Sequence, residues 1–459
     1  MVGGPAWQGG IRVAIGSGAL ALAGSLALAG VGAAASAASP RAPATPDRPA
    51  ETRVAAAGTP AASASSLSRS GLKRELRSAI SSAGGGSGAW VFDTGAGRKP
   101  VLFARNATKP RILASNQKLF TTAAALDRFG SAHRFETAAY ARGKRIGKRD
   151  QIIDGNLVLR GDGDPALGTQ TFAGRRGLPV TRIGALAQAV KRAGIRAIKG
   201  KVRADDGIFD RRRGIPATGY RAGAYLSPLS GLSYNSGHGS RGYASAPELE
   251  AAKAFRKALR KKGVRVRPGV GRTSLSRRGL KRPPLATVSS PMLATLAAAT
   301  NKPSNNFFAE MLLKRVGGGP NNRGTTKRGA RRVQRFARQA GTKVKAADGS
   351  GLGRGNKASP KQVGKLLRRM NASSEGLAFR QSLAVAGRDG TLAGRMRGTA
   401  AQGDCRGKTG TLSAISTLSG YCTVGNDRIA FSILMNGVDV NRARSAQDRM
   451  AAAIARYRR

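Results

Sequence analysis

The chain has 459 residues, 40% of them hydrophobic, which is enough for two or three domains of the usual size of about 100–200 residues each. Lys and Arg outnumber Asp and Glu by 80 to 23. The charge is spread along the whole chain without an aromatic-basic or zinc-ligand motif, so we interpret it as a surface facing an anionic extracellular polymer rather than nucleic acid. The two histidines, His133 and His238, are too few to favour a Ser-His-Asp triad or a histidine-rich metal site.

Residues 1–38 are typical of an export signal. Arg12 supplies positive charge, residues 13–34 form an apolar run, and Ala35-Ser36-Ala37 offers a cleavage site. An uncleaved membrane anchor is the alternative, because the run approaches the roughly 20 residues that span a bilayer. Residues 39–66 are rich in Pro, Ala, Ser and Thr and predict a disordered linker.

Folded sequence is expected from residue 67, and the first part extends to residue 134. The pattern predicts a helix, a strand and a returning strand, at Leu72–Ser82, Gly88–Asp93 and Val101–Ala104. A second helix begins around Leu113 and carries Ser115 and Lys118. Their spacing of three places them on one helix face. Because a serine is a weak nucleophile that needs a nearby base, this pair is a candidate for catalysis.

The pattern changes over residues 135–288, which alternate short predicted strands with turns and carry no motif that implies chemistry. Short strands are predicted at Phe135–Ala141, Gly155–Arg160 and Ala197–Ala204, and helices at Thr181–Ala193 and Ala246–Lys262. The segment Asp162-Gly163-Asp164-Pro165 has some likeness to a cation loop. We interpret it as a turn, because the rest of a calcium-loop pattern is missing.

Residues 289–459 return to long helices and a final set of strands. Helices are predicted at Ser290–Ala299, Asn306–Arg315, Thr325–Ala340, Pro360–Met370 and Arg442–Tyr457. Three strands are expected to form one antiparallel sheet, at Cys405–Leu412, Leu418–Val424 and Arg428–Asn436.

The chain has two cysteines, Cys405 and Cys422, an even number that suits one disulfide in an exported protein. If Ser413-Ala414 is a two-residue turn, the two cysteines lie directly opposite each other, with Cβ atoms about 4.5–5.5 Å apart. A disulfide needs roughly 3.5–4.5 Å, so a modest adjustment suffices. We hypothesise a disulfide that fixes the first strand of the hairpin. Two separate small core residues are the alternative.

Three short motifs follow one another in the chain: Ser115-x-x-Lys118, Ser304-Asn305-Asn306 and Lys408-Thr409-Gly410. Each alone is weak, but together they form the set typical of penicillin-binding proteins and serine β-lactamases. The sequence resembles the D-alanyl-D-alanine carboxypeptidase/endopeptidase family, the class C low-molecular-mass penicillin-binding proteins, over residues 67 to 457. The long gap between Ser115 and Ser304 matches that family's extra domains. The resemblance rests on ILASNQKLFTTAAAL around Ser115, GNLVLRGDGDPAL, NKPSNNFFAEMLLK, DGSGLGRGN, LAVAGRDGTLAGRM, GKTGTL and LSGYC.

The resemblance implies roles for the first two motifs that agree with their chemistry. Ser115 attacks the carbonyl carbon of a peptide ending in D-Ala-D-Ala, and Lys118 takes the Ser115 proton. Ser304 relays a proton between Lys118 and the leaving nitrogen, because a hydroxyl both donates and accepts. Asn306 offers an amide to the substrate backbone. Asn305 stands where the family commonly has Asp, between the two residues that make the direct contacts.

The third motif is expected to bind the other end of the substrate. Lys408 and Thr409 hold its terminal carboxylate, and Gly410 lets it approach the strand backbone. The backbone N–H groups of Ser115 and Thr411 form the oxyanion hole, which makes Thr411 a substrate-binding position as well. No metal or organic cofactor is required.

The sequence therefore predicts an exported serine-type D-Ala-D-Ala carboxypeptidase, with D,D-endopeptidase activity on peptide crosslinks left open. Its expected partners are peptidoglycan stem peptides ending in D-Ala-D-Ala, β-lactams that acylate Ser115, and anionic wall polymers. The implied fold is an α/β transpeptidase domain with a five-stranded antiparallel sheet between helices, interrupted by an inserted, mostly-β region at 135–288. One alternative is a serine β-lactamase. The class A type needs a Glu-activated water for rapid deacylation, in a Glu-x-x-x-Asn arrangement, and no Glu in this chain is followed four residues later by Asn. A non-catalytic, basic wall-binding protein is the other.

Overall fold

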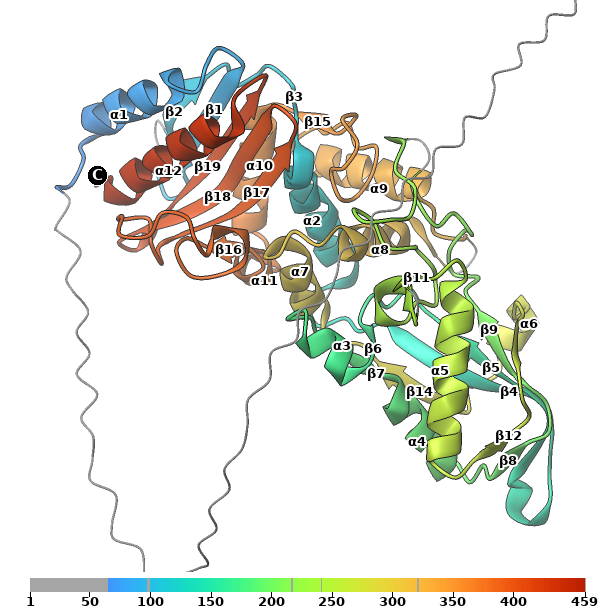
Figure 1. The fold of residues 1–459 in the computed structure, drawn as a ribbon. Helices are drawn as coiled ribbons and strands as arrows, with labels where there is room; N and C mark the ends of the chain where they lie inside the picture. Colours follow the sequence, from blue (N-terminus) through green and yellow to red (C-terminus); the bar gives the residue numbers. More distant parts are fainter. Residues whose placement is uncertain (1–64, 97–99, 216–217, 241, 320–321, 459) are drawn as a thin grey trace, which may run out of the picture. The chain divides into compact units, whose positions relative to one another are not determined.

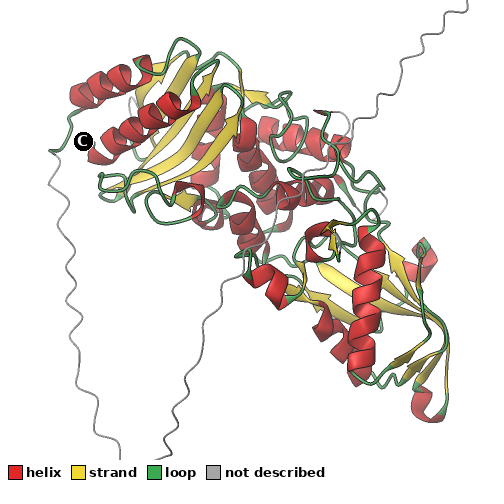
Figure 2. Ribbon diagram, in the orientation of Figure 1, coloured by secondary structure: helices red, strands yellow, loops and turns green. Residues whose placement is uncertain are grey.

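The structure is a computed structural model that describes residues 65–96, 100–215, 218–240, 242–319 and 322–458 (Figures 1 and 2). The predicted export signal at 1–38 lies outside the described residues, and so does the linker except for its last two residues. Within the described part of the chain, no helix has the length and apolar character needed to cross a membrane.

The first sheet has six antiparallel strands in the order β16-β17-β18-β19-β1-β2. The strands are β1 (Ser87–Asp93), β2 (Val101–Arg105), β16 (Ala384–Val385), β17 (Cys405–Leu412), β18 (Ile415–Val424) and β19 (Asp427–Asn436). Five long strands agree with the predicted five-stranded sheet, and the two-residue β16 adds a short sixth. Because β1 pairs with β19, the early hairpin is joined to strands from the end of the chain.

Helices cover both faces of this sheet. The helices α1 (Arg69–Ser81) and α12 (Val440–Arg456) lie along one face, packed on each other (Figure 1). Residues of β1 alternate between the two faces. Ala89 and Val91 join the core under α1 and α12. Trp90 faces α10 (Pro360–Asn371) on the other side, where a Cβ on Gly364 would lie 1.9 Å from the Trp90 ring.

A helical layer lies beyond the α10 face and contains the last residue of each of the first two motifs, Lys118 and Asn306. Its central helix, α2, is buried at every residue from Gln117 to Leu126, as expected for a helix in the middle of a core. The layer comprises α2 (Gln117–Phe129), α7 (Leu293–Asn301), α8 (Asn306–Gly317), α9 (Thr326–Gln339) and α11 (Gly376–Gln381).

The second sheet has seven strands and is formed by the middle of the chain. The strands are β4 (Glu136–Ile146), β5 (Ile152–Arg160), β8 (Ala197–Ile198), β9 (Val202–Asp205), β12 (Arg265–Val266), β13 (Val270–Arg272) and β14 (Ala286–Ser289). The helices α4 (Ile183–Arg192) and α5 (Pro247–Lys261) pack against it. The strand predicted at Ala197–Ala204 is two strands, because the chain breaks at Gly200, whose N–H donates to the Gly155 carbonyl.

Shorter elements connect these layers. They are β3 (Arg111–Ile112), β6 (Leu167–Gly168), β7 (Thr181–Arg182), β10 (His238–Gly239), β11 (Gly242–Tyr243), β15 (Lys357–Ala358), α3 (Gln170–Gly174) and α6 (Arg277–Leu280). The pairing of β3 with β15 is the one that bears on the site, because it leads the chain directly into the turn that carries Ser115.

The β17–β18 hairpin has the predicted register. Leu412 pairs with Ile415 around the two-residue turn, and Cys405 pairs with Cys422. The two cysteines form a disulfide, and both are buried. The hypothesised Cys405–Cys422 disulfide is therefore confirmed, and its role in fixing β17 stays a prediction.

Candidate active site

Ser115 lies in a single 3₁₀ turn, Ala114–Asn116, that runs into α2. The turn is tightly held from the sheet side. The Asn116 side chain donates to the Lys408 carbonyl (2.9 Å) and to the Thr417 hydroxyl (2.8 Å). Ala114 has a φ of 46°, a left-handed conformation that costs energy for a residue other than glycine. The surroundings fix this conformation, so the fold itself holds Ser115 in one position.

Two glycines let the backbone approach this turn closely. A Cβ on Gly351 would lie 1.8 Å from the Ala114 carbonyl oxygen. On Gly410 it would lie 2.9 Å from the Ser115 nitrogen and 2.3 Å from the Thr417 hydroxyl. Gly410 is predicted from the sequence to admit the substrate. The structure adds a second requirement, which is contact between β17 and the Ser115 turn.

Lys118 is completely buried, and its ammonium group has three neutral acceptors. Nζ lies 3.0 Å from the Ser115 Oγ, 2.7 Å from the Asn306 Oδ1 and 2.7 Å from the Ser350 carbonyl oxygen. Burial lowers the pKa of Lys118 to about 7, and the more distant carboxyl groups of Asp348 and Glu310 raise it only in part. A lysine with this pKa is neutral in a large fraction of molecules near neutral pH, as a general base must be.

Glu310 and Asp348 bind the loop that contacts Lys118, and no sequence motif predicts a role for either of them. Glu310 Oε1 accepts hydrogen bonds from the N–H groups of Gly349 (2.9 Å) and Ser350 (2.7 Å). Asp348 accepts from the N–H groups of Gly351 and Gly353, both at 2.7 Å. Burial raises the pKa of Glu310 to about 8 and also raises that of Asp348. The two carboxyl groups shape the loop whose Ser350 carbonyl binds Lys118.

The second motif stands at the beginning of α8. Asn305 is the N-cap, and its side chain accepts from the Phe308 N–H, a capping role that Asn and Asp share. This explains why Asn replaces the family's usual Asp at little cost. Ser304 is half-buried, with a φ of 60°. No hydrogen bond links its hydroxyl to another described residue.

Asn306 has protein partners at both ends of its amide. Its Oδ1 accepts from Lys118, and its Nδ2 donates to the Tyr225 carbonyl at 2.9 Å. Tyr225 belongs to the middle part of the chain, and 73% of its surface is exposed. The middle part of the chain therefore reaches the candidate site and orients the amide, a contact that spacing along the sequence does not reveal.

The third motif lies on β17, where β16 pairs only with Arg406 and Gly407. Lys408 is fully buried, with Nζ donating to the Thr409 carbonyl at 2.9 Å. Burial lowers the pKa of Lys408 well below its ordinary value, and Lys118 lowers it further. The Thr409 hydroxyl contacts that of Thr391 at 2.7 Å, and the Thr411 hydroxyl accepts from Arg444 at 3.2 Å. Lys408, Thr409 and Thr411 thus lie on the part of β17 that β16 does not cover.

The sequence also matches a known protein family. The family model described as D-Ala-D-Ala carboxypeptidase 3 (S13) matches residues 81–240 and 240–457. The chain belongs to this family. It is therefore a serine peptidase of the D-Ala-D-Ala carboxypeptidase type and acts on peptidoglycan. A D-alanyl-D-alanine carboxypeptidase from an Actinomadura species is 29% identical over 453 residues, which cover 81% of each chain.

Solved structures share the fold of this S13 chain. Penicillin binding protein 4 from Haemophilus influenzae superposes with a TM-score of 0.63 at 20% identity, covering 82% of this chain and 97% of that one. A predatory peptidoglycan endopeptidase from Bdellovibrio bacteriovorus superposes with a TM-score of 0.51 at 18% identity, covering 76% of this chain and 85% of that one.

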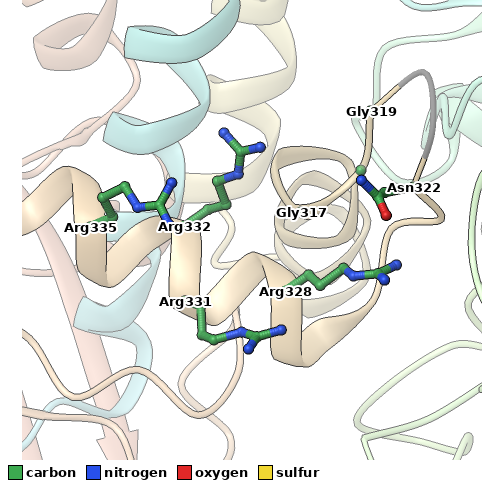
Figure 3. Close-up of a pocket in the computed structure, with 8 residues that line it drawn as sticks. Gly317, Gly319, Asn322, Arg328, Arg331, Arg332 and Arg335 are labelled. Atoms are coloured by element: carbon green, nitrogen blue, oxygen red, sulfur yellow. The ribbon is translucent and has the colours of Figure 1, made fainter.

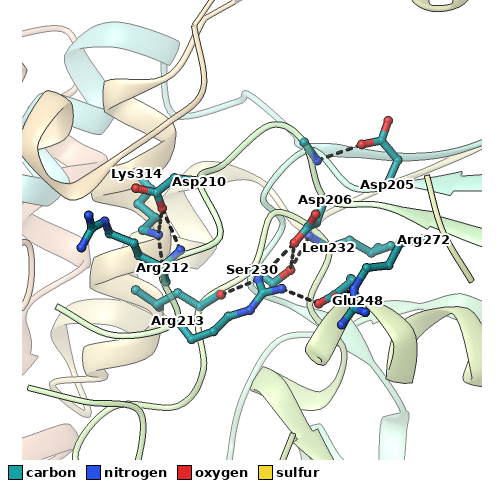
Figure 4. A network of polar contacts seen from close by, with 12 residues as sticks. Asp205, Asp206, Asp210, Arg212, Arg213, Ser230, Leu232, Glu248, Arg272 and Lys314 are labelled. Carbon is teal, nitrogen blue, oxygen red and sulfur yellow. Dashed lines mark hydrogen bonds and ion pairs between the residues drawn. The ribbon is translucent and has the colours of Figure 1, made fainter. Parts of the chain in front are cut away.

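The S13 chain has a second polar cluster where residues 205–213 and Glu248 meet the far end of α8 (Figure 4). Lys314 is buried there and donates to the Asp210 carboxylate at 2.6 Å and to the Arg212 carbonyl at 2.8 Å. The next residue after Arg212, Arg213, forms ion pairs with Asp206 (3.0 Å) and Glu248 (2.6 Å). Asn306, Glu310 and Lys314 are spaced four apart along α8, so one helix face contacts the site and the insertion.

Proposed function

We propose that Ser115 is the nucleophile of an exported D-Ala-D-Ala carboxypeptidase and that neutral Lys118 is its general base. The observation that supports this most strongly is the 3.0 Å contact between Lys118 Nζ and Ser115 Oγ. In this contact a buried amine meets a hydroxyl on a rigid turn. Among the described residues, no carboxylate forms an ion pair with that amine. A serine becomes reactive when a positioned base removes its proton.

The acylation step moves one proton and exchanges one bond. The Ser115 oxygen bonds to the carbonyl carbon of the penultimate D-Ala, and its proton passes to Lys118. The peptide C–N bond then breaks, and the proton passes through Ser304 to the leaving nitrogen, releasing D-Ala. In deacylation, water adds its OH to the acyl group and returns its other proton to Ser115 by the same lysine.

The open part of β17 supports a binding mode for the substrate backbone. From Lys408 onward this strand has no β16 partner, so an extended peptide can pair with it as an added strand. The N–H groups of Ser115 and Thr411 then form the oxyanion hole. Removing one donor of this kind typically slows a reaction by about 100–1,000-fold.

Lys408 and Thr409 anchor the terminal carboxylate in this proposal. The Thr409 hydroxyl already lies beside that of Thr391, which gives the carboxylate two adjacent hydroxyl donors. Lys408 contributes through its position beneath the strand, because its side chain is buried and bonded to the Thr409 carbonyl. Asn306 completes the site by keeping its amide fixed between Lys118 and Tyr225.

We propose further that residues 67–134 and 289–459 form the catalytic domain and that 135–288 is the insertion. β-Lactams would acylate Ser115, because they mimic the acyl-D-Ala-D-Ala backbone. The Haemophilus influenzae relative has been solved in complex with a β-lactam. Endopeptidase activity on crosslinks is also proposed, since a Bdellovibrio relative with this fold is named as an endopeptidase.

Incubation with a labelled penicillin and with a peptide ending in D-Ala-D-Ala tests the proposal. Wild type should form a long-lived covalent adduct and release D-Ala, and Ser115→Ala should do neither. Ser413→Ala removes an exposed hydroxyl at the tip of the neighbouring hairpin and should behave as wild type. An adduct on Ser115→Ala would refute the assignment, and rapid turnover of the penicillin would support a β-lactamase instead. A crosslinked peptide dimer as substrate tests the endopeptidase part.

A further inference from the structure

Helix α9 carries a cationic face that the proposed chemistry does not use. Its sequence, TKRGARRVQRFARQ, contains no acidic residue. Val333, Phe336 and Ala337 are buried against the helical core. On its other sides, Arg328, Arg331, Arg332 and Arg335 line a cavity of about 260 Å³ together with Gly317, Gly318, Gly319 and Asn322 (Figure 3).

The position of this cavity is fixed by close packing of α8 on α9. A Cβ on Gly317 would lie 2.4 Å from the Gly329 nitrogen, and a Cβ on Gly329 would lie 2.2 Å from the Leu313 carbonyl oxygen. Only glycine at both positions permits this approach. The arginines therefore stand on a rigid helix pair, with the Gly317–Gly319 turn beside them.

The positive charge of this surface is largely uncompensated. No carboxylate lines the cavity, and no ion pair within the described ranges involves Arg331, Arg332 or Arg335, all of which are exposed. Arg128 lies nearby and donates to the Val316 and Gly318 carbonyls. Its pKa is lowered first by burial and then by the charge of Arg332, so the guanidinium groups repel one another.

A larger cavity, of about 750 Å³, continues past the same turn. It shares Gly319 and Asn322 with the first cavity. Its basic lining residues are Arg128, Arg160, Lys281, Arg315 and Arg323. Asp162 is the single carboxylate in that lining, and it is paired with Arg315 at 2.9 Å. We call the two cavities together the arginine trough.

We propose that the arginine trough binds a phosphodiester polymer of the cell envelope and so keeps the enzyme beside its substrate. Guanidinium groups form bidentate hydrogen bonds with phosphate oxygens, which gives a geometric fit that the point charge of a lysine lacks. From Arg328 to Arg335 the helix rises by roughly 10 Å. A single phosphate cannot contact that whole length, so the ligand must carry several.

The lining of the trough argues for an envelope polymer and against a nucleic acid. Single strands bind to aromatic side chains that stack on their bases. Phe129 is the aromatic residue of the trough, and its ring is already covered by Arg128 at 5.1 Å and Arg315 at 5.4 Å. A polymer without bases needs no such platform. An enzyme that acts on peptidoglycan works in the cell envelope, and it therefore encounters the other polymers of the envelope there.

Binding of labelled poly(glycerol phosphate) to the full chain tests the proposal. Replacing Arg331, Arg332 and Arg335 by Gln should weaken binding on the order of tenfold and reduce its salt dependence. The control variant Lys257→Gln, Arg260→Gln, Lys261→Gln removes the same charge from exposed positions of α5 and should change binding by less than about twofold. Both variants should react with penicillin as wild type does, which separates this proposal from that for Ser115.

Three outcomes would overturn the proposal. The first is an equal loss of affinity in both variants, because binding would then follow net charge alone. The second is competition by free glycerol phosphate that matches the polymer at equal phosphate concentration. The third is a trough variant that loses affinity for single-stranded DNA while keeping its affinity for poly(glycerol phosphate).

Discussion

Two buried lysines lie at opposite ends of helix α8, and the charge of their partners differs. Lys118 contacts Asn306 at the start of the helix; it has three neutral acceptors, and its pKa is about 7. Lys314 belongs to the last turn of the helix and contacts the Asp210 carboxylate at 2.6 Å. Burial lowers the pKa of Lys314 too, but Asp210 opposes that effect.

The comparison shows how one residue type serves two purposes in one core. Burial disfavours the charged form of any lysine, and a contacting carboxylate restores it. A charged lysine in a buried pair holds two parts of a structure together, whereas a lysine deprived of such a partner can accept a proton. The position of a single carboxylate therefore separates Lys314, which is held in an ion pair, from Lys118, which can accept a proton.

The largest effect is expected from Lys118→Met, which keeps an unbranched side chain but removes the base. Acylation by penicillin should slow by at least about 1,000-fold, within the usual range for a general base. Rates of adduct formation by mass spectrometry measure this. If Lys118→Met retained most of the wild-type rate, Lys118 would not be the base.

Lys314→Met should affect stability rather than chemistry. Breaking a buried ion pair typically costs about 3–5 kcal/mol, and we expect the lower end because the Asp210 side chain is 24% exposed. Urea unfolding measures the loss. The double change with Asp210→Asn should recover part of it, since no unpaired carboxylate then remains. Stability near the wild-type value with lost acylation would contradict this division of roles.

The disulfide that begins at Cys405, three residues before Lys408 on β17, is expected to stabilise the sheet without taking part in the reaction. Replacing Cys405 and Cys422 by Ala should lower the free energy of unfolding by about 2–3 kcal/mol, the range for a loop of this length. The acylation rate at low temperature should remain near that of wild type. A large loss of rate in the folded variant would give the disulfide a role in positioning Lys408.

The smallest effect is expected from Glu310→Gln, which keeps an acceptor for the Gly349 and Ser350 N–H groups. The charge of Glu310 raises the pKa of Lys118, so its removal should shift the pH profile of acylation to lower pH. The shift should be a fraction of a unit, because the pKa of Glu310 is itself about 8. A shift to higher pH would contradict the electrostatic argument.

Sequence patterns predicted the parts of the fold that depend on local signals. The β17–β18 register follows from the turn at Ser413-Ala414 and from pairing of nearby residues. Parallel pairing of β5 with β8 and β9 joins residues far apart in the chain, and periodicity carries no information about it. The break at Gly200 also depends on contact with another strand.

The same distinction between local patterns and distant contacts applies to the candidate site. Motif spacing identified Ser115, Lys118 and the residues of the other two motifs. It could not identify Glu310, which acts through a backbone loop about forty residues later, or Tyr225, whose carbonyl orients Asn306. The repeated glycines after Asp348 were the available signal for that loop, since they indicate a close backbone approach.

The central claim is that Lys118 activates Ser115 as a neutral amine, and the pH dependence of acylation tests it most directly. The second-order rate of penicillin acylation should be measured between about pH 5 and pH 9. Because the proton must leave Lys118 before it can act as a base, the rate should rise with pH through about 7 and then level off. A rate that stayed constant across this range, or fell as the pH rose through 7, would contradict the claim.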